Sequence, residues 1–205
     1  MLNQYLQEMT EIALRYGATV DKYIGDAVMI FFGDPDSAGV REDALQCVLM
    51  AMAMQKRVRE LQDEWHKAGF TRPFRIRVGI HTGYCTVGNF GTESRMDYTI
   101  VGSAVNLASR IESSATPGDI YISEDTWLLV RDSVNCVKAA IVTPKGFSYP
   151  VPLYKVQLEE STEIVRLQEE GVDITLDTAV LDADQKDKIR RLLSHLVEDV
   201  EDQDP

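Results

Sequence analysis

Hydrophobic residues recur at intervals of three and four along two parts of the chain, which is the spacing of an amphipathic α-helix. The first set stops before Gly17 and comprises Leu2, Tyr5, Leu6, Met9, Ile12 and Ala13. The second set lies between about Arg41 and Lys67 and comprises Leu45, Val48, Leu49, Met52 and Val58. The sequence therefore predicts a helix that is already under way at the first residue, and a long core-facing helix that Gly69 ends.

Short runs of β-forming residues predict two hairpins. Gly25-Asp26 interrupts the first run, at residues 20–32, and suits a two-residue turn because glycine accepts positive φ at no steric cost. The second hairpin is predicted at residues 74–89, where a strand of alternating polar and apolar residues reaches Thr82-Gly83 and a further strand follows.

Strands and short helices alternate in the next part of the chain. The predicted strands lie at residues 98–101, 120–122, 134–142 and 152–158. Ser103 and Ser123 are expected to cap helices that run to about Ser113 and Val130. Strands grouped in hairpins with helices between them indicate an α+β fold, in which an antiparallel or mixed sheet carries helices on one face.

Composition and charge divide the chain into a body and a tail. Its 205 residues, 44% of them hydrophobic, fit one domain of about 150 residues with an appendage. The net charge is −12, and residues 158–205 alone carry 15 acidic against 5 basic residues. The body is thus almost neutral, which argues against DNA or RNA as a partner because phosphate backbones require a basic field.

The cysteines and apolar runs indicate a reducing, cytoplasmic location. Cys47, Cys85 and Cys136 are odd in number and lack a CxxC pair, so neither a disulfide framework nor a zinc site is expected. The longest mostly apolar run, Ala44 to Met54, is too short to cross a bilayer. No charged-then-apolar leader is recognisable either.

The first hairpin carries a lysine and an aspartate four residues apart. A carboxylate at its tip, Asp26, can ligate Mg²⁺, while Lys22 on the incoming strand offers an ammonium group to a base or a phosphate. This arrangement favours a nucleotide site. The alternative is a surface hairpin with an ordinary Gly-Asp turn.

A second chemical cluster opens the helix after residue 102. Asn106 and Arg110 are four residues apart and share a helix face. An amide that bonds a ribose and a guanidinium that grips phosphate oxygens suit a nucleotide, although a solvated helix face is the alternative. Lys145, before the last strand, is either a phosphate-binding lysine or a turn lysine.

Four segments in order resemble the catalytic domain of the class III adenylyl cyclases, over residues 1–158. They are Lys22 to Met29, Arg77 to Gly83, Val101 to Arg110, and Lys145-Gly146 before Pro150 to Tyr154. The resemblance implies a ferredoxin-like α+β fold, with a central, mostly antiparallel sheet and flanking helices. Residues 159–205 are then an acidic extension, either disordered or partly helical, with one helix predicted at residues 184–197.

The resemblance also implies roles for six residues. Asp26 is similar to the second of the family's two metal-binding aspartates, and Lys22 with Thr99 to a base-reading pair typical of subclass IIIb, which selects adenine. Asn106 resembles the residue that orients the ribose, Arg110 the one that stabilises the transition state, and Lys145 the triphosphate lysine. The implied reaction converts ATP to cyclic AMP and pyrophosphate with two Mg²⁺ or Mn²⁺ ions per site.

The family takes its other metal aspartate from a strand that precedes the first helix. We expect that strand, and with it the first metal aspartate, to lie outside the sequence given. Asp21 and Asp34 are poor substitutes: Asp21 is expected to point to the strand face opposite Lys22, and Asp34 lies well beyond the hairpin tip. His81 has no assignable catalytic role, and a hydrogen-bonded structural histidine is expected there.

The resemblance implies a homodimer with ATP sites at its interface, because one chain carries both the metal carboxylate and the phosphate-side residues. A sensory or membrane domain upstream is possible in such proteins. One alternative is a catalytically silent, nucleotide-binding regulatory module. A diguanylate cyclase shares a related hairpin, but its Gly-Gly-Asp/Glu-Glu-Phe turn differs from residues 24–28 here, and a purely structural protein would leave four ordered motifs as coincidence.

Overall fold

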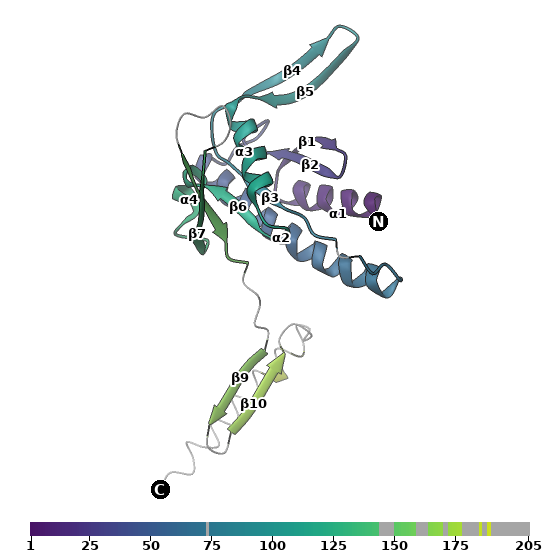
Figure 1. Ribbon diagram of the computed structural model, residues 1–205, viewed down its shortest axis with the longest axis vertical. Helices are drawn as coiled ribbons and strands as arrows, with labels where there is room; N and C mark the ends of the chain where they lie inside the picture. Colours follow the sequence, from purple (N-terminus) through teal and green to yellow (C-terminus); the bar gives the residue numbers. More distant parts are fainter. Residues whose placement is uncertain are drawn as a thin grey trace. The chain divides into compact units, whose positions relative to one another are not determined.

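The computed structural model describes residues 1–72, 74–143, 150–158, 164–169 and 172–177, together with residues 185, 188 and 189. The chain forms two compact units, Met1–Gln157 and Leu158–Pro205. The elements are shown in Figure 1.

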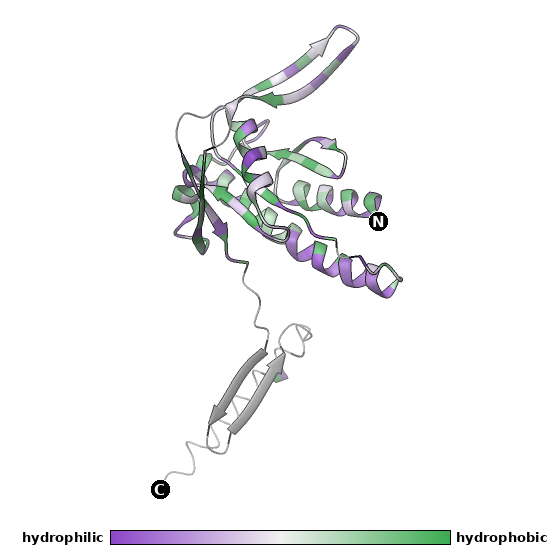
Figure 2. Ribbon diagram, in the orientation of Figure 1, coloured by the Kyte–Doolittle hydropathy of each residue, from purple (hydrophilic) through white to green (hydrophobic). Residues whose placement is uncertain are grey.

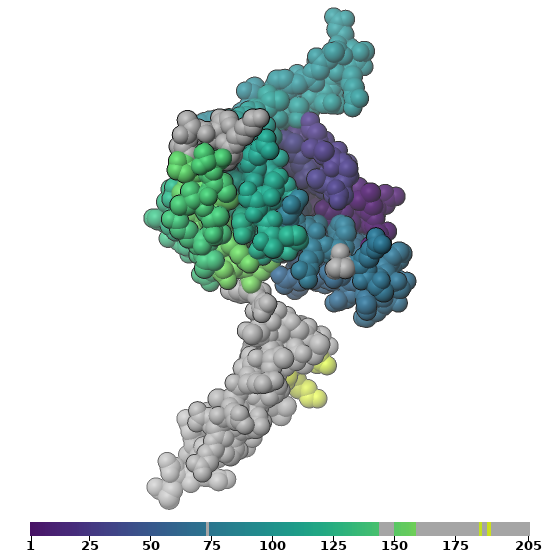
Figure 3. Space-filling view, viewed as in Figure 1, coloured from purple at the N-terminus to yellow at the C-terminus, as the bar shows by residue number. Residues whose placement is uncertain are grey.

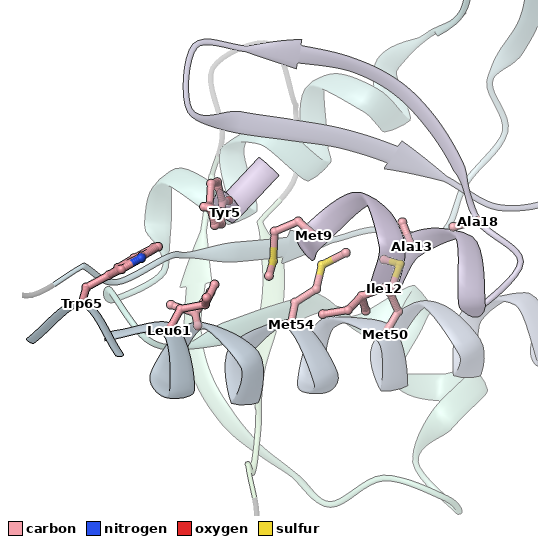
Figure 4. Packing of buried hydrophobic residues seen from close by; sticks show 10 residues of the cluster. Tyr5, Met9, Ile12, Ala13, Ala18, Met50, Met54, Leu61 and Trp65 are labelled. Carbon is pink, nitrogen blue, oxygen red and sulfur yellow. The ribbon is translucent and has the colours of Figure 1, made fainter. Parts of the chain in front are cut away.

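Two helices supply the main hydrophobic core of the first unit. Both helices predicted from the spacing of apolar residues are confirmed, and α1 (Leu2–Arg15) packs along α2 (Val40–Lys67). Of the residues predicted for the core face of α2, Val48 and Val58 are buried, whereas Leu45, Leu49 and Met52 are only partly buried. Figure 4 shows these side chains meeting between the helices. The buried residues of this core are Tyr5, Met9, Ile12, Ala13, Ala18, Met50, Met54, Val58, Leu61 and Trp65. The opposite side of α1 is polar, so hydrophobic and hydrophilic residues interleave along it in Figure 2.

An ion-pair cluster joins the same two helices at their edge. The guanidinium of Arg57 on α2 donates to both carboxylate oxygens of Glu8 on α1, at 2.7 and 2.9 Å. It also contacts Glu60 and Glu64 at 3.0 Å each. The hydrogen bonds from Arg57 lower the pKa of Glu8. A forked contact of this kind fixes the rotation of α1 on α2.

The hairpin predicted around Gly25-Asp26 is confirmed. Strand β1 (Thr19–Ile24) pairs antiparallel with β2 (Ala27–Phe31), and Gly25 adopts a φ of +66° in the turn. The register shifts between Val20 and Lys22, so Asp21 sits in a β-bulge. A bulged residue leaves the regular alternation of side chains, which matters for the site below.

The central sheet is mixed, with the order β3-β6-β8-β7 (Figure 1). Strand β3 (Val78–Ile80) runs parallel to β6 (Ile120–Ser123). Strand β8 (Val151–Val156) pairs antiparallel with both β6 and β7 (Cys136–Val142). The predicted α+β class is confirmed by this sheet and by its helices.

The predicted second hairpin is wrong. Strand β3 is confined to three residues and pairs with β6, whereas β4 (Thr86–Thr92) pairs with β5 (Arg95–Val101) in a separate two-stranded ribbon. Local alternation identified the strands but not their partners, because the parallel β3-β6 pairing joins residues about forty positions apart. The ribbon projects from the rest of the unit in Figure 3.

Helices cover both faces of the central sheet, so the expectation of helices on one face is also wrong. Helix α3 (Ser103–Ser114) packs on the sheet face that holds Leu153. The ring of Trp127 on α4 (Glu124–Val130) stacks on the ring of Tyr154, with the two ring centroids 4.3 Å apart. Successive residues of a strand point to opposite faces, which places α3 and α4 on opposite sides. A Cβ at Gly79 would lie 2.1 Å from the backbone N of Glu112, so glycine permits this close packing of α3 on β3.

One of the two predicted helix caps is confirmed and the other is wrong. Ser123 accepts a hydrogen bond from the backbone N–H of Thr126 and caps α4 as predicted. Ser103 is instead the first residue of α3, and Gly102 occupies the capping position without a side-chain cap. The pattern located both helix starts to within one residue.

The second unit contains an antiparallel hairpin that the sequence analysis did not predict. Strand β9 (Ile164–Glu169) pairs with β10 (Val172–Asp177). Of the helix predicted at residues 184–197, the structure describes only residues 185, 188 and 189, which are helical. The remaining positions of that prediction lie outside the described residues.

An apolar cavity of about 780 Å³ lies in the first unit between β2 and β3. Its lining includes Met9, Val28, Ile30, Met54, Val78 and Ile80. Within the described part of the chain, β2 pairs only with β1, and β3 pairs only with β6. The cavity is therefore flanked by two strand edges that could each accept a further strand.

His81 follows β3 and is a hydrogen-bonded histidine, as expected. Its Nδ1 lies 2.8 Å from the Ser123 hydroxyl, and the Asp125 carboxylate is 3.8 Å away. Burial lowers the pKa of His81 below its usual value near 6.5, against the opposing charge of Asp125. The folded protein thus holds the imidazole neutral in a pH range in which the unfolded chain binds a proton.

We predict that His81 makes folding stability fall under mildly acidic conditions. Its contribution is complete above the unfolded pKa near 6.5 and is lost as pH falls towards the lower folded pKa. Urea unfolding at pH 7.5, 6.5 and 5.5 should show a weaker pH dependence for His81→Asn than for the wild type. His66→Asn, on the exposed end of α2, is the control and should keep the wild-type slope; equal slopes for all three proteins would contradict the prediction.

Candidate nucleotide site

Lys22 lies on β1 beside a buried carboxylate. Its Nζ is 3.3 Å from Oδ1 of Asp21, whose side chain is 1% exposed, whereas the Lys22 side chain is 40% exposed. The ammonium group therefore has one side held by the protein and another side open to a ligand. An ammonium group has three protons, so it can donate to the Asp21 carboxylate and to a ligand at the same time.

Thr99 on β5 contacts the same carboxylate. Its hydroxyl donates to Oδ2 of Asp21 at 2.6 Å, and the backbone N–H of Ile100 donates to that oxygen at 3.3 Å. Thr99 is buried. The structure thus brings together Lys22 and Thr99, the two residues predicted as a base-reading pair, through a residue that the prediction left out.

The predicted direction of the Asp21 side chain is wrong. We expected it on the strand face opposite Lys22, but the bulge at Asp21 turns its carboxylate towards both Lys22 and Thr99. Alternation in the sequence could not reveal this, because a bulge is set by the pairing with β2 and not by local residue type. Both carboxylate oxygens face protein groups, which leaves Asp21 ill suited to bind a metal.

Asp26 occupies the exposed tip of the β1-β2 hairpin, where the sequence predicted it. Its carboxylate makes no hydrogen bond or ion pair with any residue that the structure describes. The charge of Asp26 also acts on Tyr5 of helix α1: burial, and after it this charge, raise the pKa of the Tyr5 hydroxyl to about 12. Free carboxylate oxygens suit Mg²⁺ or Mn²⁺. Within the described ranges, however, no three His, Cys, Asp or Glu side chains gather into a complete metal site.

Asn106 and Arg110 lie one turn apart on α3, and both are exposed. Neither side chain has a hydrogen-bond or ion-pair partner among the described residues, so both groups can reach a ligand. Asp34 is engaged elsewhere, since the Tyr98 hydroxyl donates to its carboxylate. Lys145 lies outside the described residues.

The apolar cavity between β2 and β3 borders these groups without being lined by them, since its lining includes Ile24 and Ala27 of the β1-β2 hairpin. Its lining includes neither Lys22, Asp26 nor the exposed pair on α3. A triphosphate requires cations, and among the described residues no lysine or arginine lines this cavity. The candidate nucleotide-binding groups are therefore the polar side chains of Lys22 on β1, Thr99 on β5, and Asn106 and Arg110 on α3.

Comparison with known proteins identifies the family. The family model for the adenylate and guanylate cyclase catalytic domain matches residues 1–157, so the chain belongs to this family. Adenylate cyclase 1 of Rhizobium meliloti (strain 1021) is 34% identical over 160 residues, which are 76% of this chain and 23% of that protein. An adenylate cyclase of Anabaena cylindrica is 41% identical over 112 residues, covering 54% and 21% of the two chains. The chain thus spans about a fifth of the length of these relatives.

Solved structures confirm the fold. The adenylyl cyclase CyaB from P. aeruginosa has a TM-score of 0.74 and 52% identity, with 76% of this chain and 79% of that chain covered. The guanylyl cyclase Cya2 has a TM-score of 0.71 and 37% identity, with 76% and 77% covered. The α+β cyclase fold is therefore confirmed. Proteins named as adenylyl cyclases and proteins named as guanylyl cyclases share this fold. Among the described residues, no helix combines the length and apolar character of a membrane span.

Proposed function

We propose that this chain is the catalytic domain of an adenylyl cyclase, which converts ATP to 3′,5′-cyclic AMP and pyrophosphate. The observation that carries the proposal is the placement of Lys22 and Thr99 on one buried carboxylate. A lysine and a hydroxyl can donate to adenine N1 and accept from the 6-amino group. Relatives named as adenylate cyclases, with up to 52% identity, support the same choice of base.

The remaining residues divide the work on the ribose and the phosphates. Asn106 orients the ribose so that its 3′-oxygen faces the α-phosphorus, and Arg110, one turn along α3, donates to phosphate oxygens as charge develops. Lys145 is assigned to the triphosphate. Asp26 would hold a metal ion, and two bound Mg²⁺ or Mn²⁺ ions would lower the pKa of the 3′-hydroxyl and neutralise charge on the phosphates.

A second metal carboxylate is needed beside Asp26. We infer that a further β-strand of the complete protein fills the cavity of about 780 Å³ between β2 and β3 and carries that carboxylate. The two free strand edges and the apolar lining both suit such a strand. The strand would join the hairpin to the central sheet as one continuous sheet.

The site is further proposed to be completed by a second copy of the chain. Large apolar side chains on the projecting β4-β5 ribbon are exposed, namely Phe90, Met96, Tyr98 and Val101. Exposed apolar groups on a projecting ribbon favour burial against a partner. A twofold pairing would set Asp26 of one protomer against Lys22, Asn106 and Arg110 of the other, giving two sites per homodimer.

The first prediction of the proposed function tests the metal role of Asp26 in the full-length protein. Asp26→Ala should lower kcat for cyclic AMP formation on the order of a thousandfold, because the site loses a metal ligand. Asp36→Ala, an exposed aspartate in the loop after β2, is the matched control and should keep wild-type turnover. Comparable rates for both variants would exclude the metal assignment. A wild-type protein that binds ATP without turnover would support the silent regulatory module instead.

The second prediction concerns the base. Lys22→Glu combined with Thr99→Cys should reduce the ratio of kcat/KM for ATP over GTP by at least about tenfold, because the donor and acceptor positions are exchanged. The absolute rate should fall as well. Initial rates with both nucleotides measure the ratio, and an unchanged ratio would refute the roles of these two residues.

The third prediction tests whether sites lie between protomers. Asp26→Ala and Arg110→Ala should each be inactive alone and regain activity when mixed. Random exchange makes about half of the dimers mixed, and each has one intact site of two, so about a quarter of wild-type activity is expected. Pull-down of differently tagged chains confirms exchange. Exchange without recovery would place the complete site within one protomer.

A further inference from the structure

Asp21 is a buried carboxylate with an unusual set of neighbours. Its Oδ2 accepts from the Thr99 hydroxyl at 2.6 Å and from the Ile100 N–H at 3.3 Å. Its Oδ1 has no hydrogen-bond partner in the described structure and faces the Lys22 ammonium in an ion pair at 3.3 Å. Burying a carboxylate is costly unless such groups compensate it, so its position requires an explanation beyond packing.

The hydrogen bond to Asp21 fixes what Thr99 can offer to a ligand. A hydroxyl has one proton to donate and two lone pairs that accept, whereas an ionised carboxylate only accepts. The Thr99 proton must therefore point to Asp21, and only lone pairs remain for a ligand. A hydroxyl held in this way accepts from an amino group and repels a carbonyl oxygen.

We propose that Asp21 determines the base preference of the site by holding the Thr99 hydroxyl as an acceptor, beside the Lys22 ammonium, which is a donor in any setting. The inference rests on the proposed adenylyl cyclase function, because it concerns the same base-reading pair. Adenine presents an amino group at position 6 and an acceptor at N1, which match this polarity. Guanine presents a carbonyl oxygen and an N–H at the same positions, so both contacts become repulsive. Asp21 itself touches no substrate and acts as a positioning residue.

Without Asp21, the Thr99 hydroxyl would rotate freely and could donate to a carbonyl oxygen as readily as it accepts from an amino group. Discrimination worth one hydrogen bond would then disappear, which is about a tenfold change in the preference between the two bases. A merely structural role for Asp21 would instead lower turnover of both nucleotides together. The ratio between nucleotides is therefore the decisive quantity.

The test measures kcat/KM for ATP and GTP in the full-length protein carrying Asp21→Ala. The ATP/GTP ratio should fall about tenfold or more. Asp21→Leu is the second variant: leucine is close to aspartate in shape but has no oxygen to accept from the Thr99 hydroxyl, so the ratio should also fall. Asp119→Asn is the matched control. Asp119 is also partly buried and ion-paired, because its Oδ1 lies 2.8 Å from Nζ of Lys155, but it does not contact Thr99. It should leave the ratio unchanged.

A double-mutant cycle shows whether Asp21 acts through Thr99. In a Thr99→Val background no hydroxyl remains to orient, so adding Asp21→Ala should change the ATP/GTP ratio by less than about twofold. A large additional change there would overturn the proposal, as would a wild-type ratio in both single Asp21 variants.

A binding measurement distinguishes failure of the proposed role of Asp21 from failure of the proposed adenylyl cyclase function. Competition of ATP and GTP against a fluorescent ATP analogue measures base preference without turnover, so it also serves variants that are catalytically slow. A wild-type protein that binds neither nucleotide, or prefers GTP, would overturn both the function and the role of Asp21. A wild type that prefers ATP, with Asp21 variants that keep this preference, would overturn the role of Asp21 alone.

Discussion

The ion-paired carboxylate of Asp21 is the contact on which the arrangement of the candidate site depends. The β1-β2 and β4-β5 hairpins belong to separate two-stranded sheets and share no ladder of backbone hydrogen bonds. Asp21 on β1 reaches Thr99 and the backbone of Ile100 on β5, and so links the two hairpins at a buried point. Charged hydrogen bonds in a buried setting are directional and strong, which fixes Lys22 relative to Thr99.

The helical core supports the other end of the same hairpin. Helix α1 packs on α2 through Met9, Met54 and their neighbours, and Arg57 fixes its rotation through Glu8. Partly buried side chains of β1 and β2 pack on this core, so the strands are anchored while their turn extends into solvent. A rigid hairpin with a free carboxylate at its tip offers a positioned ligand at little cost in conformational entropy.

Features with a local cause could be predicted from the sequence, and those with a distant cause could not. Helical periodicity identified α1 and α2, and Gly25 marked the turn that presents Asp26. The pairing of β3 with β6 and of β4 with β5 depends on contacts between distant residues, which alternation does not specify. The bulge that turns Asp21 towards Thr99 arises in the same way, so the sequence analysis paired Lys22 with Thr99 but missed the residue that connects them.

Some candidate residues already have side-chain partners in the described structure and others have none. This difference follows the two roles proposed for them, base recognition and binding of phosphate and metal. Lys22 and Thr99 are held by Asp21 before any ligand arrives, as recognition of a rigid base requires. Asp26, Asn106 and Arg110 are exposed and have no side-chain partner in the same described ranges. Charges that meet a triphosphate and its metal ions gain most when no internal partner must first be displaced. The two residues proposed to read the base are thus positioned within one chain, whereas the residues proposed for phosphate and metal have no such internal partner in the described structure.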